Sequence, residues 1–273
     1  NEGFEFSLNT VNIRNKNFTW SSTFGLSHNK NTIKHLYYRY EDVLNEAGEV
    51  VGSKEVDDVN RGWFVGKDIS AIWDHEFIGI WQEDEAEEAA KYGQQPGDAK
   101  VRDVNGDYKI TQEDKVFLGQ ETPKFRWSFR NEFILFRNWD ISLNLYSQMG
   151  HKQSTTEYLN FFDNLGDYSN TYKREYWTPE NKSNSYARLK STRPSNINPK
   201  KVINKGFIRL ENISVSYRVP QQFARKLMAK EISIYGTVRN VAVWAFDKEW
   251  DYWDPETKGL LPRTFTFGAS ITF

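Results

Sequence analysis

The chain has 273 residues and is almost neutral, with 36 basic and 37 acidic residues, so it lacks the basic surface of a nucleic-acid-binding protein. The absence of cysteine excludes disulfides, thiol catalysis and cysteine-ligated zinc. No stretch approaches the roughly 18 apolar residues of a membrane-spanning helix, whereas a transmembrane β-barrel needs only about 10 alternating residues in each strand.

Seven segments place apolar residues at every second position, which predicts β-strands with one apolar and one polar face. In the first segment Phe4, Phe6 and Leu8 alternate with polar side chains. In chain order the predicted strands cover residues 3–13, 17–27, 124–136, 139–150, 206–219, 230–242 and 262–273.

The last segment has the cleanest alternation and ends on an aromatic residue. One face carries only hydroxyl groups or glycine, and the other carries Phe265, Phe267, Ala269, Ile271 and Phe273. A membrane barrel points such an apolar face at lipid and the polar face at a wet lumen. A soluble antiparallel sandwich also alternates, so the pattern of one strand leaves both fold classes open.

The predicted connections alternate between short and long. The short ones are residues 14–16, 137–138 and 220–229, the last with one helical turn, and the long ones are about 28–123, 151–205 and 243–261. Short turns on one rim and long loops on the other are typical of outer-membrane barrels. We therefore expect an all-β fold: an antiparallel transmembrane β-barrel with extracellular long loops and a periplasmic C-terminus. Because seven is an odd number of strands, we expect residues 1–273 to be the C-terminal part of a larger barrel.

One segment of the first long loop has the spacing of a calcium-binding loop. Positions 1, 3, 5, 7, 9 and 12 of an EF-hand-type loop are matched by Asp103, Asn105, Asp107, Lys109 (through its carbonyl), Thr111 and Asp114. Tyr108 stands where glycine is usual, and the last ligand is aspartate, as in dockerin-type loops. The spacing predicts a calcium ion that braces the loop, and the alternative is an Asx-rich turn without an ion.

The remaining polar clusters predict no chemistry. Residues 83–91 form a short acidic helix with a solvated face, and no zinc spacing connects His28, His35, His75 and His151. No nucleophile elbow, phosphate loop or dinucleotide fingerprint occurs, so we predict no enzyme activity. A sugar-stacking platform, an interface anchor and a packed loop are all open interpretations of the aromatic cluster Trp244, Phe246, Trp250, Tyr252 and Trp253.

Several motifs follow one another in a characteristic order. They are Asp103-Val-Asn-Gly-Asp107, Leu118-Gly119, Pro123-Lys-Phe125, the segment from Phe207 to Pro220, Tyr235-Gly-Thr-Val-Arg-Asn240, Asp254-Pro-Glu256 and the ending from Pro262 to Phe273. Together they resemble SusC/RagA-type TonB-dependent transporters of Bacteroidetes over most of the chain. The resemblance implies a barrel of about 22 strands with an N-terminal plug. It also implies a SusD-like surface lipoprotein as a lid and energy from the TonB complex.

The sequence thus predicts an outer-membrane protein that imports oligosaccharides or oligopeptides, with the plug and the remaining strands outside these residues. Lipid-facing aromatic residues hold the barrel in the bilayer. The polar face lines the lumen with Arg126, Arg130, Ser142, Asn144, Arg218 and Arg239. No residue is assigned to substrate binding. The alternative is a soluble, calcium-stabilised β-sandwich that binds carbohydrate through the aromatic cluster at Trp250 and Trp253.

Overall fold

The structure is a computed structural model that describes residues 1–155, 175–251 and 253–273. The chain divides into two compact units. Unit 1 consists of Asn1–Asn31, Thr122–His151 and Asn204–Phe273, and unit 2 consists of Thr32–Glu121 and Lys152–Ile203. None of the helices in the described ranges has the length and apolar composition needed to traverse a bilayer.

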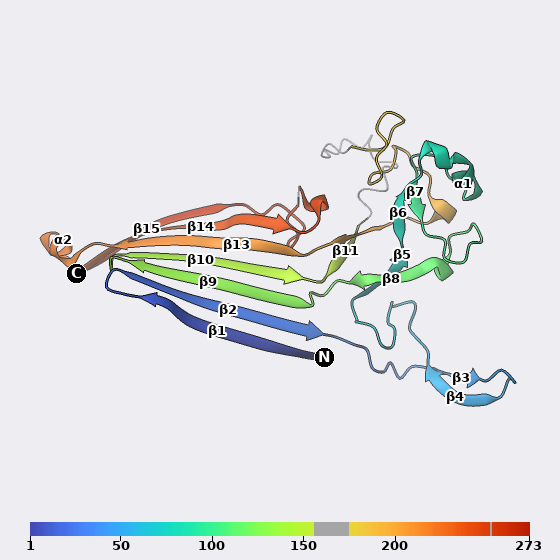
Figure 1. The fold of residues 1–273 in the computed structure, drawn as a ribbon, viewed down its shortest axis with the longest axis horizontal. Helices are drawn as coiled ribbons and strands as arrows, with labels where there is room; N and C mark the ends of the chain where they lie inside the picture. The colour runs from blue at the N-terminus through green and yellow to red at the C-terminus, as the bar shows by residue number, and fades with distance from the viewer. Residues whose placement is uncertain (156–174, 252) are drawn as a thin grey trace. The chain divides into compact units, whose positions relative to one another are not determined.

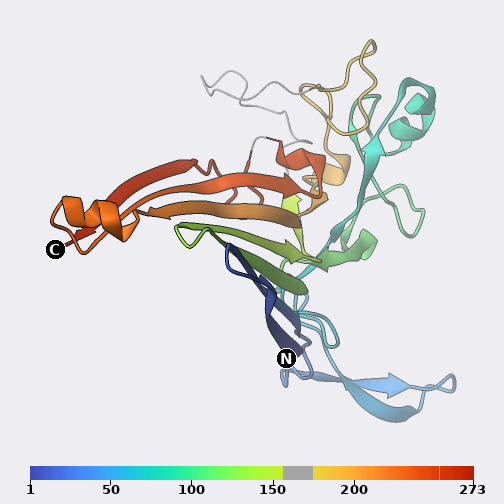
Figure 2. The same ribbon diagram turned by 60° about the vertical axis from the view of Figure 1, so that its left-hand side comes forward.

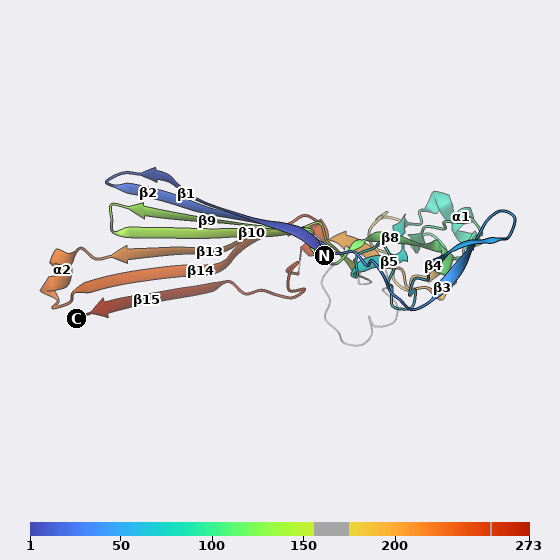
Figure 3. The same cartoon turned by 90° about the horizontal axis from the view of Figure 1, so that it is seen from below.

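Unit 1 is a single antiparallel sheet of seven strands, ordered β1-β2-β9-β10-β13-β14-β15 (Figure 1). Its strands are β1 (Glu2–Arg14), β2 (Phe18–Lys30), β9 (Phe125–Leu135), β10 (Trp139–Met149), β13 (Phe207–Arg218), β14 (Glu231–Ala245) and β15 (Thr264–Thr272). Figure 3 shows them side by side in this order, and Figure 2 shows the twist of the sheet. The predicted all-β fold is confirmed, and each predicted strand end lies within three residues of the observed one.

The register of the strands collects the apolar side chains on one face. Phe24, Phe129, Leu145 and Leu210 lie opposite one another on four adjacent strands. Directly opposed residues of antiparallel strands project to the same side, so this row and its neighbours form an apolar face. The face is open, with Phe267 exposed to 78%. A soluble sandwich would need a second sheet packed on such a face, and the described strands of unit 1 form one sheet only.

A β-bulge at Glu211 decides which side chains of β13 reach the polar face. The register steps from Leu210 to Asn212 against both β10 and β14. Leu210 and Ile213, three residues apart, therefore share the apolar face, and Arg209 lies on the polar face with Asn212. In an unbroken strand Arg209 would share the apolar face with Ile213, because side chains alternate with a period of two.

The connections at one end of the sheet are short, as predicted. At residues 15–17 the Asn15 Oδ1 accepts hydrogen bonds from the N–H groups of Asn17 and Phe18, at 3.0 and 2.9 Å. At residues 136–138 the chain turns with positive φ angles at Phe136 and Arg137. The connection between β13 and β14 contains α2 (Gln221–Lys226), which confirms the predicted helical turn. The C-terminus lies at the same end of the sheet (Figure 1).

Unit 2 contains short elements that the alternation of the sequence does not predict. Its described residues form four two-stranded sheets. Three are antiparallel: β3 (Tyr40–Leu44) with β4 (Val50–Glu55), β5 (Ala71–His75) with β8 (Lys115–Gln120), and β6 (Phe77–Ile80) with β7 (Ala99–Val101). The fourth pairs β11 (Lys152–Thr155) with β12 (Lys201–Asn204). The predicted acidic helix is confirmed as η1 (Glu83–Glu85) and α1 (Ala86–Lys91). Two further helical turns are η2 (Gln112–Asp114) and η3 (Pro194–Asn196).

A small core joins distant segments of unit 2. Ile80, Ala99, Trp177 and Ala187 are buried against one another. Beside them the fully buried Asp98 accepts hydrogen bonds from the Arg188 guanidinium at 2.9 Å and from the backbone N–H of Thr192 at 2.7 Å. Because a buried carboxylate is costly unless it is paired, these bonds fix residues that lie about 90 positions apart in the chain.

Candidate functional site

The polar face of the seven-stranded sheet carries all six residues that the sequence assigns to a lumen. The register places Arg130, Asn144 and Arg239 in one row across the sheet. Ser142 lies in the next row, and Arg126 lies opposite Gln148. Arg218 forms ion pairs with Asp140 at 3.6 Å and with Glu231 at 3.3 Å. A face of this composition suits the wall of a water-filled channel.

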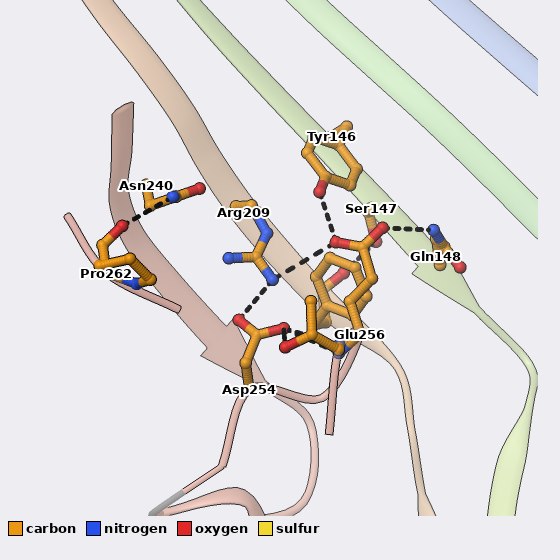
Figure 4. A network of polar contacts seen from close by, with 10 residues as sticks. Tyr146, Ser147, Gln148, Arg209, Asn240, Asp254, Glu256 and Pro262 are labelled. Carbon is orange, nitrogen blue, oxygen red and sulfur yellow. Dashed lines mark hydrogen bonds and ion pairs between the residues drawn. The ribbon is translucent and has the colours of Figure 1, made fainter. Parts of the chain in front are cut away.

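Arg209 is the centre of a buried ionic network on this face (Figure 4). Its side chain is only 3% exposed, and its Nη2 lies 2.6 Å from Asp254 and 3.4 Å from Glu256. Glu256 also accepts hydrogen bonds from the Tyr146 hydroxyl at 2.6 Å and from the Gln148 amide at 3.1 Å. The network therefore connects β10 and β13 with the loop that follows β14.

The same loop is shaped by Asp254 itself. The Asp254 Oδ1 accepts hydrogen bonds from the backbone N–H groups of Glu256 and Thr257, at 3.0 and 3.1 Å. Its backbone N–H donates to Gly259, and its carbonyl accepts from Lys258, so the turn closes on itself. One carboxylate oxygen of Asp254 thus accepts the hydrogen bonds of the turn, and the other oxygen accepts the hydrogen bond from Arg209.

Two further contacts hold the loop between β14 and β15 against the end of the sheet. The Trp250 indole donates to the carbonyl of Asn204 at 2.7 Å, and the Asn240 amide donates to the carbonyl of Pro262 at 2.8 Å. Trp250 is the last residue of the short helix η4 (Lys248–Trp250). Of the aromatic cluster, Trp244 is half-exposed, whereas Trp250 is tied down, and Tyr252 lies outside the described residues. The contacts of Trp250 favour the interpretation as a packed loop.

The sequence interpretation missed the network because it assigned no face of the sheet to Arg209. Continuing the alternation of Ile213, Val215 and Tyr217 back without a break would have placed Arg209 on the apolar face. The available signal was the odd spacing between the apolar residues Leu210 and Ile213, which indicates a bulge between them. Asp254 and Glu256 were noted only as part of a family motif.

A groove of about 460 Å³ lies on the polar face beside this network. Tyr146 and Gln148, which hold Glu256, also line the groove. The polar side chains that complete it come from β1, β2 and β9: Glu5, Ser7, Ser27, Arg126 and Ser128. The groove offers hydroxyl groups, one carboxylate and one guanidinium, and this donor set can bind a polar oligomer of either peptide or sugar.

The predicted calcium loop is folded around its own carboxylates. Asp103 accepts hydrogen bonds from the N–H groups of Gly106 at 2.7 Å and Tyr108 at 2.9 Å. Burial opposes ionisation of Asp103, but these two bonds hold its pKa below the usual value. The fully buried Asp114 accepts hydrogen bonds from the N–H groups of Val104 at 2.8 Å and Thr111 at 2.7 Å. The first and last predicted ligands are therefore both fixed by backbone groups of the loop.

The departure at Tyr108 does not prevent the turn that the loop needs. Tyr108 has φ = 62°, the left-handed conformation that glycine supplies at this position in other loops. In the described ranges, no three His, Asp or Glu side chains are grouped closely enough to hold a metal ion by themselves. An ion at this place would therefore also need the Asn105 amide and backbone carbonyl oxygens.

His151 is the buried histidine of unit 1 and directly follows β10. Burial lowers its pKa to about 4, and the positive charges of Lys205 and Arg126 act in the same direction. The imidazole is therefore neutral at physiological pH, and its Nδ1 has no hydrogen-bond partner among the described residues. Within the part of the chain that the structure describes, none of the four histidines belongs to a group of three or more side chains that could hold a metal ion.

The chain is similar to known proteins over its whole length. No protein-family model matches it. Two curated relatives from Formosa agariphila align with all of it: TonB-dependent receptor P26 at 29% identity and TonB-dependent receptor P3 at 25% identity. The chain spans 29% and 28% of the lengths of these relatives.

Solved structures show the same fold. The chain is similar to the RagAB peptide transporter with a TM-score of 0.67 and 15% identity, covering 99% of this chain and 29% of that one. It is also similar to the RagAB peptide importer in the "open-open" state, with a TM-score of 0.65, 16% identity and a coverage of 99% and 28%. These relatives are receptors and transporters, not enzymes, which confirms the prediction that the chain has no enzyme activity.

Proposed function

Because this chain is a homologue of outer-membrane TonB-dependent receptors, we propose that it forms part of the barrel wall of a transporter that imports oligosaccharides or oligopeptides. The observation that carries this proposal is the two-faced sheet, in which an open apolar face is backed by a polar, charged one. Since the chain spans 29% of its relative, the plug and the other strands belong to the rest of the transporter.

The C-terminus is proposed to be periplasmic. All the short connections of unit 1 lie at the end of the sheet where the C-terminus lies (Figure 1). Outer-membrane barrels place short turns in the periplasm and long loops outside the cell. In this orientation unit 2 and the loop after β14 are extracellular.

The groove beside the Arg209 network is proposed to contact the substrate. It presents Arg126 and Glu5 together with three serine hydroxyl groups, so it can bind both the charged and the neutral polar groups of an oligomer. The RagAB neighbours are a peptide transporter by their description, which supports the peptide class. The oligosaccharide class rests on the hydroxyl-rich lining.

A SusD-like surface lipoprotein is proposed as the partner of the extracellular loops. The support is the family resemblance of the motifs in the sequence. Tagging the complete transporter and identifying the proteins that co-purify with it from detergent-solubilised outer membranes tests this proposal. A lipoprotein in near-equal amount is expected, and a transporter purified alone would contradict it.

The import function is tested by uptake in cells that lack the transporter gene. Complementation with the complete wild-type gene is expected to restore uptake of a labelled oligopeptide or oligosaccharide, and a protonophore is expected to abolish it, because TonB depends on the proton gradient. Separate peptide and glycan libraries identify the substrate class. Uptake that continues at the same rate without the gene or without the gradient would refute import by this protein.

The calcium ion is proposed to bind the loop formed by residues 103–114. The support is the oxygen-rich donor set of the loop and its left-handed turn at Tyr108. Asp103, Asn105, Asp107 and Asp114 would provide side-chain oxygens, Lys109 its carbonyl and Thr111 its hydroxyl. A bound ion of this kind would brace an extracellular loop.

Removing charge from this loop is expected to abolish calcium binding. In the double variant Asp103→Asn/Asp107→Asn the side chains keep their shape but lose two negative charges that attract the ion. Isothermal titration of the complete transporter is expected to show one fewer calcium ion for the variant than for the wild type. The double variant Asp42→Asn/Asp84→Asn removes the same charge elsewhere in unit 2 and serves as the control. Equal stoichiometry in all three proteins would leave the Asx-rich turn without an ion as the correct interpretation.

A further inference from the structure

The connection between β13 and β14, residues 220–230, exposes several large apolar side chains. Phe223 is 50% exposed, Leu227 is 65% exposed and Met228 is 87% exposed. They belong to α2 and the turn that follows it, where Met228 has φ = 57°. This is far more apolar surface than a short periplasmic turn needs in order to reverse the chain.

The inner side of this connection packs on the apolar side of the sheet. Ala224 and Ala229 are buried against Ile232 and Val219. Ile232 lies opposite Ile271 and on the same face of β14 as Ile234. The two alanines allow the helix to approach this face closely. The exposed side chains of α2 and the turn after it therefore extend the apolar face beyond the ends of the strands. The helix α2 itself lies at the end of the sheet where the C-terminus lies (Figures 1 and 3).

The same connection is strongly basic. It contains Arg225, Lys226 and Lys230 and no Asp or Glu, whereas the whole chain has a net charge of -1. The Lys226 ammonium lies 5.7 Å from the centre of the Phe223 ring. Among the described residues, neither Arg225 nor Lys226 has a carboxylate within ion-pair distance; Lys230 donates to the backbone oxygen of Phe273. Two of the three positive charges are thus directed to solvent next to apolar side chains.

We propose that residues 220–230 form an interfacial anchor that binds anionic phospholipid in the periplasmic leaflet of the outer membrane. Phe223, Leu227 and Met228 enter the boundary between headgroups and acyl chains, and Arg225 and Lys226 contact the phosphates. Exposed apolar side chains next to basic ones are the combination that binds an anionic membrane surface. The inference rests on the proposed barrel and its orientation, because only there does the apolar face meet lipid.

Quenching by brominated lipids tests the anchor in the complete transporter, after any other cysteines have been removed. Single-cysteine variants carry an environment-sensitive fluorophore at Met228→Cys, at Phe267→Cys on the apolar face, or at Leu260→Cys in the loop after β14. The protein is reconstituted into nanodiscs that contain brominated phosphatidylglycerol or brominated phosphatidylcholine. Labels at positions 228 and 267 are expected to be quenched, and the label at 260 is expected to be unaffected. At position 228 phosphatidylglycerol is expected to quench more strongly than phosphatidylcholine.

The charges are tested by adding Arg225→Gln and Lys226→Gln to the Met228→Cys variant. The preference for phosphatidylglycerol at position 228 is expected to fall by about tenfold, because each basic side chain near an anionic surface contributes to binding. An unchanged preference would refute the role of the two charges. Quenching at 267 without quenching at 228 would refute the anchor but keep the barrel, and crosslinks from 228 to another protein would identify a protein partner instead. Absence of quenching at 267 would refute the proposed membrane barrel itself.

Discussion

Replacement of Arg209 by methionine is expected to destabilise the seven-stranded sheet by about 3–5 kcal/mol, because it leaves the buried carboxylate of Asp254 and the partly exposed carboxylate of Glu256 without their cation. Asp254 is 5% exposed in its side chain and lies 2.6 Å from the guanidinium. Methionine fills a similar volume but cannot donate a hydrogen bond. The loop between β14 and β15 is then expected to leave the polar face, since repulsion between Asp254 and Glu256 is no longer compensated.

The release of this loop is measurable by limited proteolysis. Trypsin is expected to cut the Arg209→Met variant of the complete transporter after Lys248 or Lys258, both of which lie in the loop, at a rate at which the wild type stays intact. Loss of the folded band in semi-native electrophoresis is expected at a lower temperature. Arg239→Met is the matched control, because Arg239 lies on the same polar face but is exposed.

The triple variant Arg209→Met/Asp254→Asn/Glu256→Gln separates charge from packing. If uncompensated carboxylates cause the damage, neutralising them is expected to recover a large part of the lost stability. The same loss in Arg239→Met and Arg209→Met would contradict a special role for the network. A triple variant as unstable as the single one would indicate that Arg209 acts through packing and not through its charge.

Replacement of Phe267 by arginine is expected to have the second largest effect, about 2–4 kcal/mol if the side chain lies near the middle of the bilayer. Phe267 is 78% exposed on the apolar face and lies opposite Gly236. In the proposed barrel this exposed surface is covered by acyl chains, from which a guanidinium is excluded.

The neighbouring substitution Thr266→Arg provides the control for this prediction. Thr266 precedes Phe267 on β15, lies opposite Thr237, and projects to the polar face. Adding the same charge there is expected to cost less than about 1 kcal/mol, because the side chain stays in water. Both variants are introduced into the complete transporter, and the folded fraction in outer membranes and the temperature of unfolding are compared. Equal effects of the two substitutions, or a larger effect of Thr266→Arg, would refute the assignment of the faces.

Much of the sheet was predictable because its signal is local. Strand β15 alternates strictly between apolar and small polar residues, and a period of two identifies both the strand and its faces without any partner. The short connections, predicted at residues 14–16 and 137–138, follow from the gaps between alternating segments. The helical turn at 220–229 was predicted in the same way.

The inside of the long loops was not predictable from the alternation. Strands such as β6 and β7 have only four and three residues, too few for a period to emerge. They are held by contacts such as those of Asp98 with Arg188, which lies about 90 positions further along the chain. The loop at residues 103–114 is the exception, because its ligand spacing is itself a local pattern. The binding of calcium to this loop stays a prediction.

The sequence by itself therefore determined the seven strands, the side of each regular strand that is apolar, and the all-β class, since these depend on neighbours two residues apart. Only the tertiary structure decided where Arg209 points and what it binds. One extra residue at Glu211 shifts the alternation of β13 by one position. The partners Asp254 and Glu256 belong to a loop that lies 45 residues or more further along the chain. A buried ion pair depends on distances between such remote groups, and these distances exist only once the sheet has formed.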